Sequence, residues 1–202
     1  MKTPPAHAVV VLAAGRSRRL GQPKQLLRRQ GETLLHRTVR LAEATAPGAL
    51  IVVLAEGEAA TRAAISDIAC RTLFNPDPAG GLAGSLRMAA THAATFAQVL
   101  VLVCDQPALT LEHLRALLHG ARTAASACAA TLLDGVPGVP AVVPGSWFEA
   151  LPPGSGDAGF RGHLRRLDPG SLFLLPGQAL QQDIDTPAAL AQARAAGRID
   201  PA

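Results

Sequence analysis

The sequence predicts a single α/β domain in which helices flank both faces of a doubly wound, Rossmann-like, mostly parallel sheet with a small antiparallel addition. Three observations carry this prediction. Short apolar, β-branched runs alternate with longer segments of helical periodicity. The first run ends in a turn of small residues followed by basic ones, and the most apolar run ends directly at an aspartate. The length of 202 residues suits one sizeable core.

The amino-terminal part alternates strands with helices. Thr33 is a helix cap with an amphipathic run behind it, and Pro47-Gly48 ends that helix. The run 98–103 is wholly apolar after its first residue, as expected of a strand buried on both faces. After a disordered lead at 1–6, we expect a strand at 7–13, a helix at 33–45, a strand at 49–54, a helix at 58–68, a strand at 70–74, a Gly/Pro-rich loop at 75–84, a helix at 85–95 and a strand at 98–103.

The carboxyl-terminal part begins with a helix from Thr110 to about Ala121, where Glu112 suits the first turn. Pro187 is typical of the first position of a last helix. Between these helices we expect strands at 126–132 and 139–143 around a turn at 134–138, short helices within 146–167 interrupted by prolines and glycines, and a strand at 171–175; the last helix spans 187–196.

Composition favours a small anionic ligand. The formal net charge is +4, but aromatic residues make up only 3% and tyrosine is absent, which argues against nucleic acid bound by base stacking. The three cysteines are widely separated, so they predict neither a disulfide framework nor a metal site, and we expect a reducing cytoplasmic setting. No apolar run is long enough to span a bilayer, so we expect no membrane partner.

The loop after the first strand is the strongest local signal. Ala13, Ala14 and Gly15 let backbone N–H groups approach an anion, and the basic residues that follow supply positive charge. A glycine turn before a solvated basic surface would give the same pattern. The spacing does not fit a Walker A loop, and the only G-x-G-x-x-G, at 154–159, follows no strand and is rejected as a dinucleotide fingerprint.

Acidic residues supply the second signal. Asp105 follows the most apolar strand, at the edge where open parallel sheets bind ligands, and is either a turn residue or a ligand of a hard cation. Asp183 and Asp185 lie two residues apart, so an extended segment would turn both carboxylates to one side. Asp185 is equally suited to starting the last helix. The histidines have no metal-ligand spacing, and there is no G-x-S-x-G nucleophile motif.

Four motifs in order carry a family resemblance. L-A-A-G-x-S-x-R-x-G-x-P-K at 12–24, C-D-Q-P at 104–107, G-D-A-G-F-R at 156–161 and D-I-D-T-P at 183–187 resemble the MobA-like nucleotidyltransferases, and the Ala-Ala-Gly form is similar to the molybdenum cofactor cytidylyltransferases. The resemblance implies an Mg²⁺-dependent enzyme that moves CMP from CTP onto the phosphate of molybdopterin and releases pyrophosphate. It also implies a molybdenum hydroxylase as recipient of the product.

The resemblance assigns residue roles. It implies a nucleotide-binding half at about 7–125 and an acceptor-binding half at about 126–190 of one domain at 1–202. The implied catalytic residues are Lys24, Arg19 and Asp105; the nucleotide-binding residues are Leu12, Ala13, Ala14, Gly15, Ser17, Lys24, Asn75, Gly81, Ser85 and Asp105; the acceptor-binding residues are Gly138, Asp157, Gly159 and Arg161; and the metal ligands are Asp105, Asp183 and Asp185.

Single positions refine these expectations. Ala14 stands where guanylyl-transferring relatives carry Gly, so its methyl group is expected to favour CTP. Ser85 is expected at a helix N-terminus, either as an ordinary cap or with free N–H groups that bind the nucleotide. Phe160 is bulkier than the family's usual residue and alters the expected acceptor pocket, whereas Leu20 replaces a usual Met without consequence.

Two alternatives stay open. A transferase of the same fold could use another nucleotide or another phosphate acceptor, such as a sugar or lactate phosphate. A non-enzymatic carrier could bind nucleotide or cofactor and pass it on, although Lys24, Asp105 and Asp183 together exceed what carriage needs.

Overall fold

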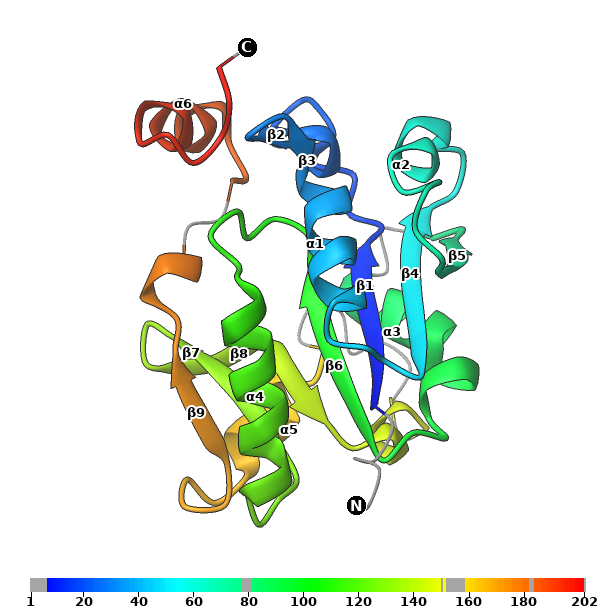
Figure 1. Cartoon of the computed structure of the whole chain (residues 1–202), viewed down its shortest axis with the longest axis vertical. Coiled ribbons are helices and arrows are strands. Elements are labelled where there is room, and N and C mark those ends of the chain that lie inside the picture. Colours follow the sequence, from blue (N-terminus) through cyan, green and yellow to red (C-terminus); the bar gives the residue numbers. More distant parts are fainter. Residues whose placement is uncertain (1–6, 78–80, 150, 152–158, 182–183, 202) are drawn as a thin grey trace.

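The computed structural model describes residues 7–77, 81–149, 151, 159–181 and 184–201. Its centre is a seven-stranded sheet in the order β5-β4-β1-β6-β8-β7-β9, beside a separate two-stranded sheet (Figure 1). The strands are β1 His7–Ala13, β2 Arg28–Arg29, β3 Glu32–Thr33, β4 Ala49–Ala55, β5 Arg71–Asn75, β6 Gln98–Val103, β7 Ala129–Leu133, β8 Val136–Val143 and β9 Phe173–Pro176. The predicted fold class is confirmed.

Six α-helices and several 3₁₀ turns surround the sheet in the described part of the chain. The helices are α1 Leu34–Glu43, α2 Ala59–Ala63, α3 Gly81–Ala93, α4 Leu111–Thr123, α5 Arg161–Arg166 and α6 Pro187–Ala195, and 3₁₀ turns span Lys24–Leu26, Gly145–Phe148 and Gln178–Leu180. The predicted caps at Thr33 and Thr110 are confirmed, since each side chain accepts a hydrogen bond from the N–H three residues on. None of these helices has both the length and the apolar composition needed to traverse a bilayer.

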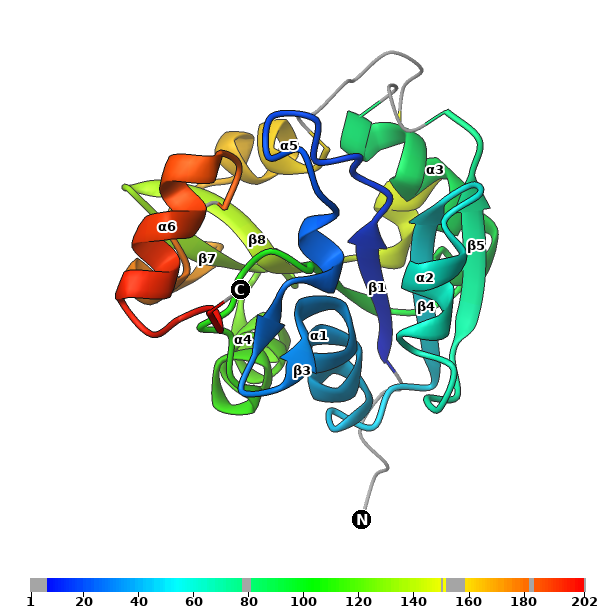
Figure 2. The ribbon, with the colours of Figure 1, turned by 90° about the horizontal axis from the view of Figure 1, so that it is seen from above.

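Alternation along β1 divides the core into two layers. Val9 and Val11 face the layer made with α1 and α4, whereas Val10 and Leu12 face the layer made with α3 and α5. Figures 1 and 2 show these helix pairs on opposite faces of the sheet. Both faces of β1 are therefore buried, and its carboxyl end leads into the loop that begins at Ala14.

Strand direction sets apart the two halves of the sheet. β1 runs parallel to β4 and β6, and β4 runs parallel to β5. β8 lies antiparallel between β6 and β7, while β9 is parallel to β7. The predicted antiparallel addition is thus built into the main sheet around β8, and the two-stranded β2–β3 sheet is a second one that the sequence did not indicate.

Several predicted boundaries are wrong, for local reasons. The turn at 134–138 contains only Asp134 and Gly135, whose φ angles of 46° and 75° allow a two-residue hairpin. β7 starts at Ala129 instead of Ser126, because Ala127 takes a left-handed φ of 55°. α2 ends at Ala63 instead of Ile68, in a series of turns.

The helix expected from Ser85 begins four residues earlier, at Gly81. Gly81 has a φ of 69°, a conformation that glycine adopts without strain, so the chain turns into α3 there. Ser85 is consequently inside α3 and cannot offer free N–H groups at a helix N-terminus. The prediction of a helix N-terminus at Ser85, either as an ordinary cap or as a source of free N–H groups, is therefore wrong.

Candidate active site

The loop predicted to bind an anion leaves the carboxyl end of β1. Gly15 is exposed, and a Cβ placed on it would meet no atom within 4 Å, so one side of the loop is open. Ala14 is only 4% exposed and packs with Leu12 and Leu86 in the layer of α3 and α5. The loop therefore has a packed underside and an open outer side at the edge where α/β sheets bind ligands.

Ser17 shapes the next turn of this loop. Its φ is 47°, an uncommon value for a residue with a side chain, and its carbonyl accepts from the N–H groups of Leu20 and Gly21 at 3.0 and 3.1 Å. Its hydroxyl accepts from the backbone N–H of Lys24 at 3.2 Å. Ser17, which was predicted as a loop residue, thus fixes the position of the Lys24 backbone.

Lys24 joins two carboxylates that are far apart in sequence. Its Nζ forms an ion pair with Asp105, which follows β6, and a second one with Asp185 at 3.1 Å. Arg19 reaches Asp185 as well, at 2.6 Å. The side chains of Lys24 and Asp105 are only 18% and 14% exposed, whereas that of Arg19 is 73% exposed. Four predicted site residues therefore meet at one point.

The electrostatics of this group favour a charged ammonium. Burial opposes the charge on Lys24, but the ion pairs with Asp105 and Asp185 outweigh it and hold the pKa of Lys24 above its ordinary value. Lys24 stays protonated throughout the physiological range. Asp105 and Asp185 thus converge on a position that the cationic ammonium of Lys24 occupies.

The donor set fits a hard divalent metal. Carboxylate oxygens are the ligands that Mg²⁺ prefers, and Asp105 and Asp185 both turn toward one positive charge. Asp183, the third predicted ligand, lies outside the described residues. Within the described residues no three His, Cys, Asp or Glu side chains form a metal-binding group. Asp105 and Asp185 are the two carboxylates of the described site that could hold such an ion.

In the second segment predicted to face the nucleotide, Asn75 and Ser85 hydrogen-bond to each other. Asn75, at the end of β5, is 3% exposed, and its Nδ2 donates to the hydroxyl of Ser85 at 3.2 Å. The side-chain Oδ1 of Asn75 accepts from the backbone N–H of Asp77 at 3.0 Å. Asn75 and Ser85 thus tie β5 to α3.

Three predicted acceptor residues line one cavity. Gly138, Gly159 and Arg161 share a cavity of about 50 Å³ whose other walls are apolar: Leu12, Leu82, Leu86, Val101, Val139, Ala141, Phe160 and Leu164. Asp157, the fourth predicted acceptor residue, lies outside the described residues. Arg161 is the only charged side chain among the described lining residues.

Phe160 belongs to the core beneath this cavity. It is 6% exposed, and its ring lies 5.0 Å from that of Phe148 and 5.8 Å from that of Trp147. Trp147 also lies 5.3 Å from the ring of His163. The extra bulk expected at Phe160 is therefore directed largely into an aromatic cluster, with one side of the ring lining the cavity.

Arg29 and Arg37, which hold the segment after Asp105, were not predicted. Arg29 donates to the Pro107 carbonyl, and Arg37 donates to that of Leu109 at 3.0 Å. Gln106, 5% exposed, donates to the carbonyl of Val139 at 2.9 Å, which joins the Asp105 turn to β8. These contacts link residues from separate elements, and no local motif in the sequence signals them.

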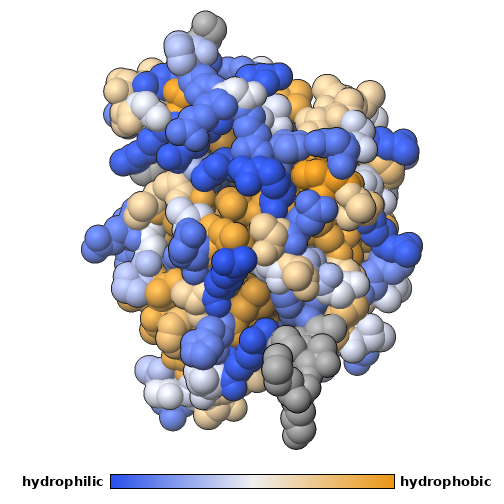
Figure 3. Space-filling model, in the orientation of Figure 1, coloured by the Kyte–Doolittle hydropathy of each residue, from blue (hydrophilic) through white to orange (hydrophobic). Residues whose placement is uncertain are grey.

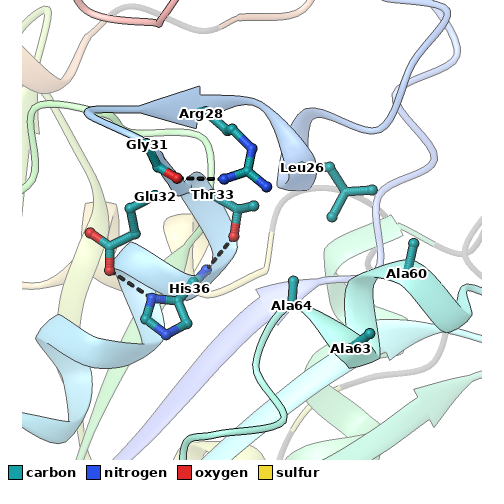
Figure 4. A pocket seen from close by; sticks show the side chains of 9 residues that line it. All are labelled: Leu26, Arg28, Gly31, Glu32, Thr33, His36, Ala60, Ala63 and Ala64. Carbon is teal, nitrogen blue, oxygen red and sulfur yellow. Dashed lines mark hydrogen bonds and ion pairs between the residues drawn. The ribbon is translucent and has the colours of Figure 1, made fainter.

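A larger cavity lies away from these residues. It measures about 550 Å³ and lies between the β2–β3 hairpin, the start of α1 and α2 (Figure 4). Its polar lining residues contact one another or nearby side chains: Arg28 donates to the Gly31 carbonyl, and His36 pairs with Glu32 at 2.7 Å. Size alone does not make it the site, and the converging charges around Lys24 identify the better candidate.

Comparison with known proteins identifies relatives of this chain. A family model described as "MobA-like NTP transferase domain" matches residues 9–170. A probable molybdenum cofactor guanylyltransferase of Opitutus terrae is 40% identical over 105 residues, which cover 52% of this chain and 50% of that protein. One of the same description from Synechococcus elongatus is 34% identical over 110 residues, which cover 54% and 55%. The matches thus span about half the length of these relatives.

Solved structures match over nearly the whole chain. Rv0371c from Mycobacterium tuberculosis is 25% identical with a TM-score of 0.74, covering 93% of this chain and 97% of that one. A homologue of it from Mycobacterium sp. strain JC1 is 29% identical with a TM-score of 0.74, covering 94% and 96%. Rv0371c has also been solved in complex with manganese.

Proposed function

The chain belongs to the family of MobA-like NTP transferase domains, and from this membership we propose that it transfers a nucleotidyl group from a nucleoside triphosphate to the phosphate of molybdopterin. The observation that carries the proposal is the meeting of Lys24, Asp105 and Asp185 at the carboxyl edge of the sheet. Nucleotide binding by about 7–125 and acceptor binding by about 126–190 follow the division of the sheet between β6 and β8.

The reaction needs no protein nucleophile. An oxygen of the acceptor phosphate attacks the α-phosphorus of the triphosphate, the new P–O bond forms, and pyrophosphate leaves with the electron pair of the broken bond. Lys24 and Arg19 would neutralise the negative charge of the phosphates, and the backbone N–H groups of the 13–16 loop would orient them. Asp105 and Asp185, with Asp183, would hold an Mg²⁺ ion, which supplies charge neutralisation between the phosphates.

We assign CTP as the nucleotide. The reason is Ala14: it stands where guanylyl-transferring relatives carry Gly, and its methyl group would take space that a purine base could use. GTP is the second candidate, because the matching curated relatives are described as guanylyltransferases. Ala14→Gly distinguishes the two nucleotides, because we expect this change to move the preference from CTP toward GTP. An unaltered preference would show that Ala14 does not select the base.

Arg161 would hold the phosphate of the acceptor. It is a cationic side chain among otherwise apolar lining residues, so it would supply the positive charge that a phosphate needs. Gly138 and Gly159 would let the acceptor approach the backbone, and Asp157 would contact its polar edge. The product, a molybdopterin dinucleotide, would pass to a molybdenum hydroxylase.

The test is pyrophosphate release with CTP, GTP, ATP or UTP, with Mg²⁺, in the presence and absence of molybdopterin. Release that needs CTP and molybdopterin and is lost in Asp105→Ala supports the proposal. Release with GTP changes the nucleotide, and release with a sugar or lactate phosphate changes the acceptor. Nucleotide binding without release in any combination would instead support a carrier.

A further inference from the structure

Gln25 is a buried polar residue next to Lys24 that the proposed reaction does not use. It lies in the 3₁₀ turn Lys24–Leu26 and is 1% exposed. Its Nε2 donates to the carbonyl of Ala13 at 2.8 Å and to that of Gly15 at 2.6 Å. A glutamine amide has two N–H hydrogens, and here one is available for each carbonyl. The side chain therefore holds the loop on both sides of Ala14.

These two hydrogen bonds determine where the loop N–H groups point. In a trans peptide the C=O of one residue and the N–H of the next point in opposite directions. Because Gln25 draws the carbonyls of Ala13 and Gly15 toward itself, the N–H groups of Ala14 and Arg16 point away from it. The outer side of the loop is also where Gly15 leaves open space.

The 3₁₀ turn Lys24–Leu26 positions both the 13–16 loop and the Lys24 ammonium. Lys24 points outward to Asp105 and Asp185, while its neighbour Gln25 points inward to the loop carbonyls. The hydroxyl of Ser17 fixes the start of this turn through the N–H of Lys24. The positions of the backbone N–H groups and of the Lys24 charge are thus coupled through two adjacent residues.

Packing alone does not explain a glutamine here. Its Oε1 is buried without a hydrogen-bond partner among the described residues, and an apolar side chain of similar size would avoid that cost. What an apolar side chain could not provide is the pair of donors to the loop. We propose that Gln25 is a positioning residue that presets the 13–16 loop for the nucleotide; this inference rests on the proposed function.

The test compares Gln25→Glu and Gln25→Met with the wild type. Glutamate keeps the shape but its carboxylate has no hydrogen for either carbonyl, and methionine removes all polarity at similar length. Gln98→Met is the matched control, because Gln98 is also buried, at 6% exposed, but lies at the amino-terminal end of β6. Two quantities are measured: the Kd of CTP and GTP with Mg²⁺, and hydrogen exchange of the 13–16 amides in the free protein.

We expect the nucleotide Kd to rise about tenfold or more in both Gln25 variants, as the loss of two hydrogen bonds to the loop implies, and exchange of the 13–16 amides to accelerate. Gln98→Met should change neither, even where its melting temperature falls by the same amount. Wild-type affinity or unchanged exchange in a folded Gln25 variant would overturn the inference alone. A wild type that binds no nucleotide would overturn the proposed function.

Discussion

Lys24 balances two carboxylates that come from different parts of the chain. Asp105 follows β6 and Asp185 precedes α6, and without a cation between them two negative charges would face each other in a half-buried place. The ammonium removes that repulsion in the free protein. The same ammonium would bind phosphate once a nucleotide is bound. Lys24 would therefore pair with the two carboxylates in the free protein and with phosphate in the nucleotide complex.

Lys24→Met should separate these two roles. We expect transfer to fall by about a hundredfold or more, because a charge aimed at the reacting phosphates is lost. Binding of Mn²⁺ to the nucleotide-free protein should tighten, since the cation that competes for Asp105 and Asp185 is gone. Electron paramagnetic resonance of free Mn²⁺ measures that affinity. Arg18→Met, at an exposed position of the same loop, is the control and should alter it little.

The residues of the site differ in how far the sequence revealed them. Lys24, Asp105 and Asp185 belong to short motifs whose residue types carry chemistry, and the structure brings these three together as ion pairs. Gln25 and Arg29 act through hydrogen bonds to backbone carbonyls. Any carbonyl is an acceptor whatever its residue, so no pattern in the sequence identifies the partner of such a donor.

At the scale of elements, His36 fastens the segment after α2 to the start of α1. Its ring nitrogens contact Glu32 at 2.7 Å and Asp67 at 3.0 Å, and Arg40 contacts Glu32 at 2.8 Å. Burial opposes the charge on His36, but the bonds from Asp67 and Glu32 outweigh it and raise the pKa of His36 above 6.5. A hydrogen bond from Arg40 is the main cause that lowers the pKa of Glu32 to about 2.

This connection should depend on pH. A histidine whose pKa is raised by folding stabilises fully below its unfolded value near 6.5 and loses that contribution as the pH rises through the folded value. We therefore expect His36→Gln to lower the melting temperature more at pH 6 than at pH 9. Thermal unfolding across that range measures it, with His119→Gln at an exposed position of α4 as control. An equal loss at both pH values would contradict the ion-pair role.

Gly120 fixes how closely α4 approaches β9. A Cβ on Gly120 would lie 2.2 Å from the Phe173 ring, so the helix packs directly on that side chain. Gly120→Ala should destabilise the protein by about 1–3 kcal/mol through this overlap, although alanine is the better helix former. Gly162→Ala in α5 is the control, because its nearest atom would be 3.7 Å away on a flexible arginine, and it should be neutral or stabilising by up to about 1 kcal/mol. Denaturant unfolding compares the two.

The type of an element was predictable where its periodic run is long. Its boundary was not predictable where the conformation of a single residue determines it. The apolar run of β6 and the capped run of α1 have clear periods, and both are confirmed. β2 and β3 are two residues each, too short for any period to show. α3 begins at Gly81, which has a positive φ. The surrounding sequence is rich in glycine and proline, so it did not distinguish a helix start at Gly81 from a continuing loop.

On the scale of the whole molecule, the C-terminal segment closes against residues 20–34. A cluster of buried apolar residues joins the first loop and α1 to α6 and the tail: Leu20, Leu27, Leu34, Ile184, Leu190, Ala193 and Ile199. Figures 1 and 2 show α6 beside the β2–β3 hairpin, and hydrophilic side chains cover this end of the face in Figure 3. Contacts between residues some 170 positions apart leave no local trace in the sequence, so this closure was not predicted.

Asp200 fastens that closure. Its carboxylate accepts from the N–H groups of Gln30 and Gly31, both at 2.7 Å, and its own N–H donates to the Arg28 carbonyl at 2.8 Å. Gln30 and Gly31 have φ angles of 55° and 80°, so the carboxylate stabilises a hairpin turn that includes a residue in an uncommon conformation. The hairpin precedes α1 and follows the Lys24 turn directly, and it is therefore tied to the loop that would bind the nucleotide.

Asp200→Ala should loosen this end of the molecule. We expect a loss of about 1–3 kcal/mol in unfolding free energy, because two N–H groups lose a charged acceptor. Hydrogen exchange at Gln30 and Gly31 should accelerate, and the nucleotide Kd should rise several-fold as Leu20 and Leu27 lose their fixed neighbours in α6. Asp168→Ala is the matched control, since Asp168 also accepts from a backbone N–H, at 3.0 Å from Gly170, but in the turn before β9. A nucleotide Kd that rises equally in both variants would mean that general destabilisation, and not the closure by the tail, governs the site.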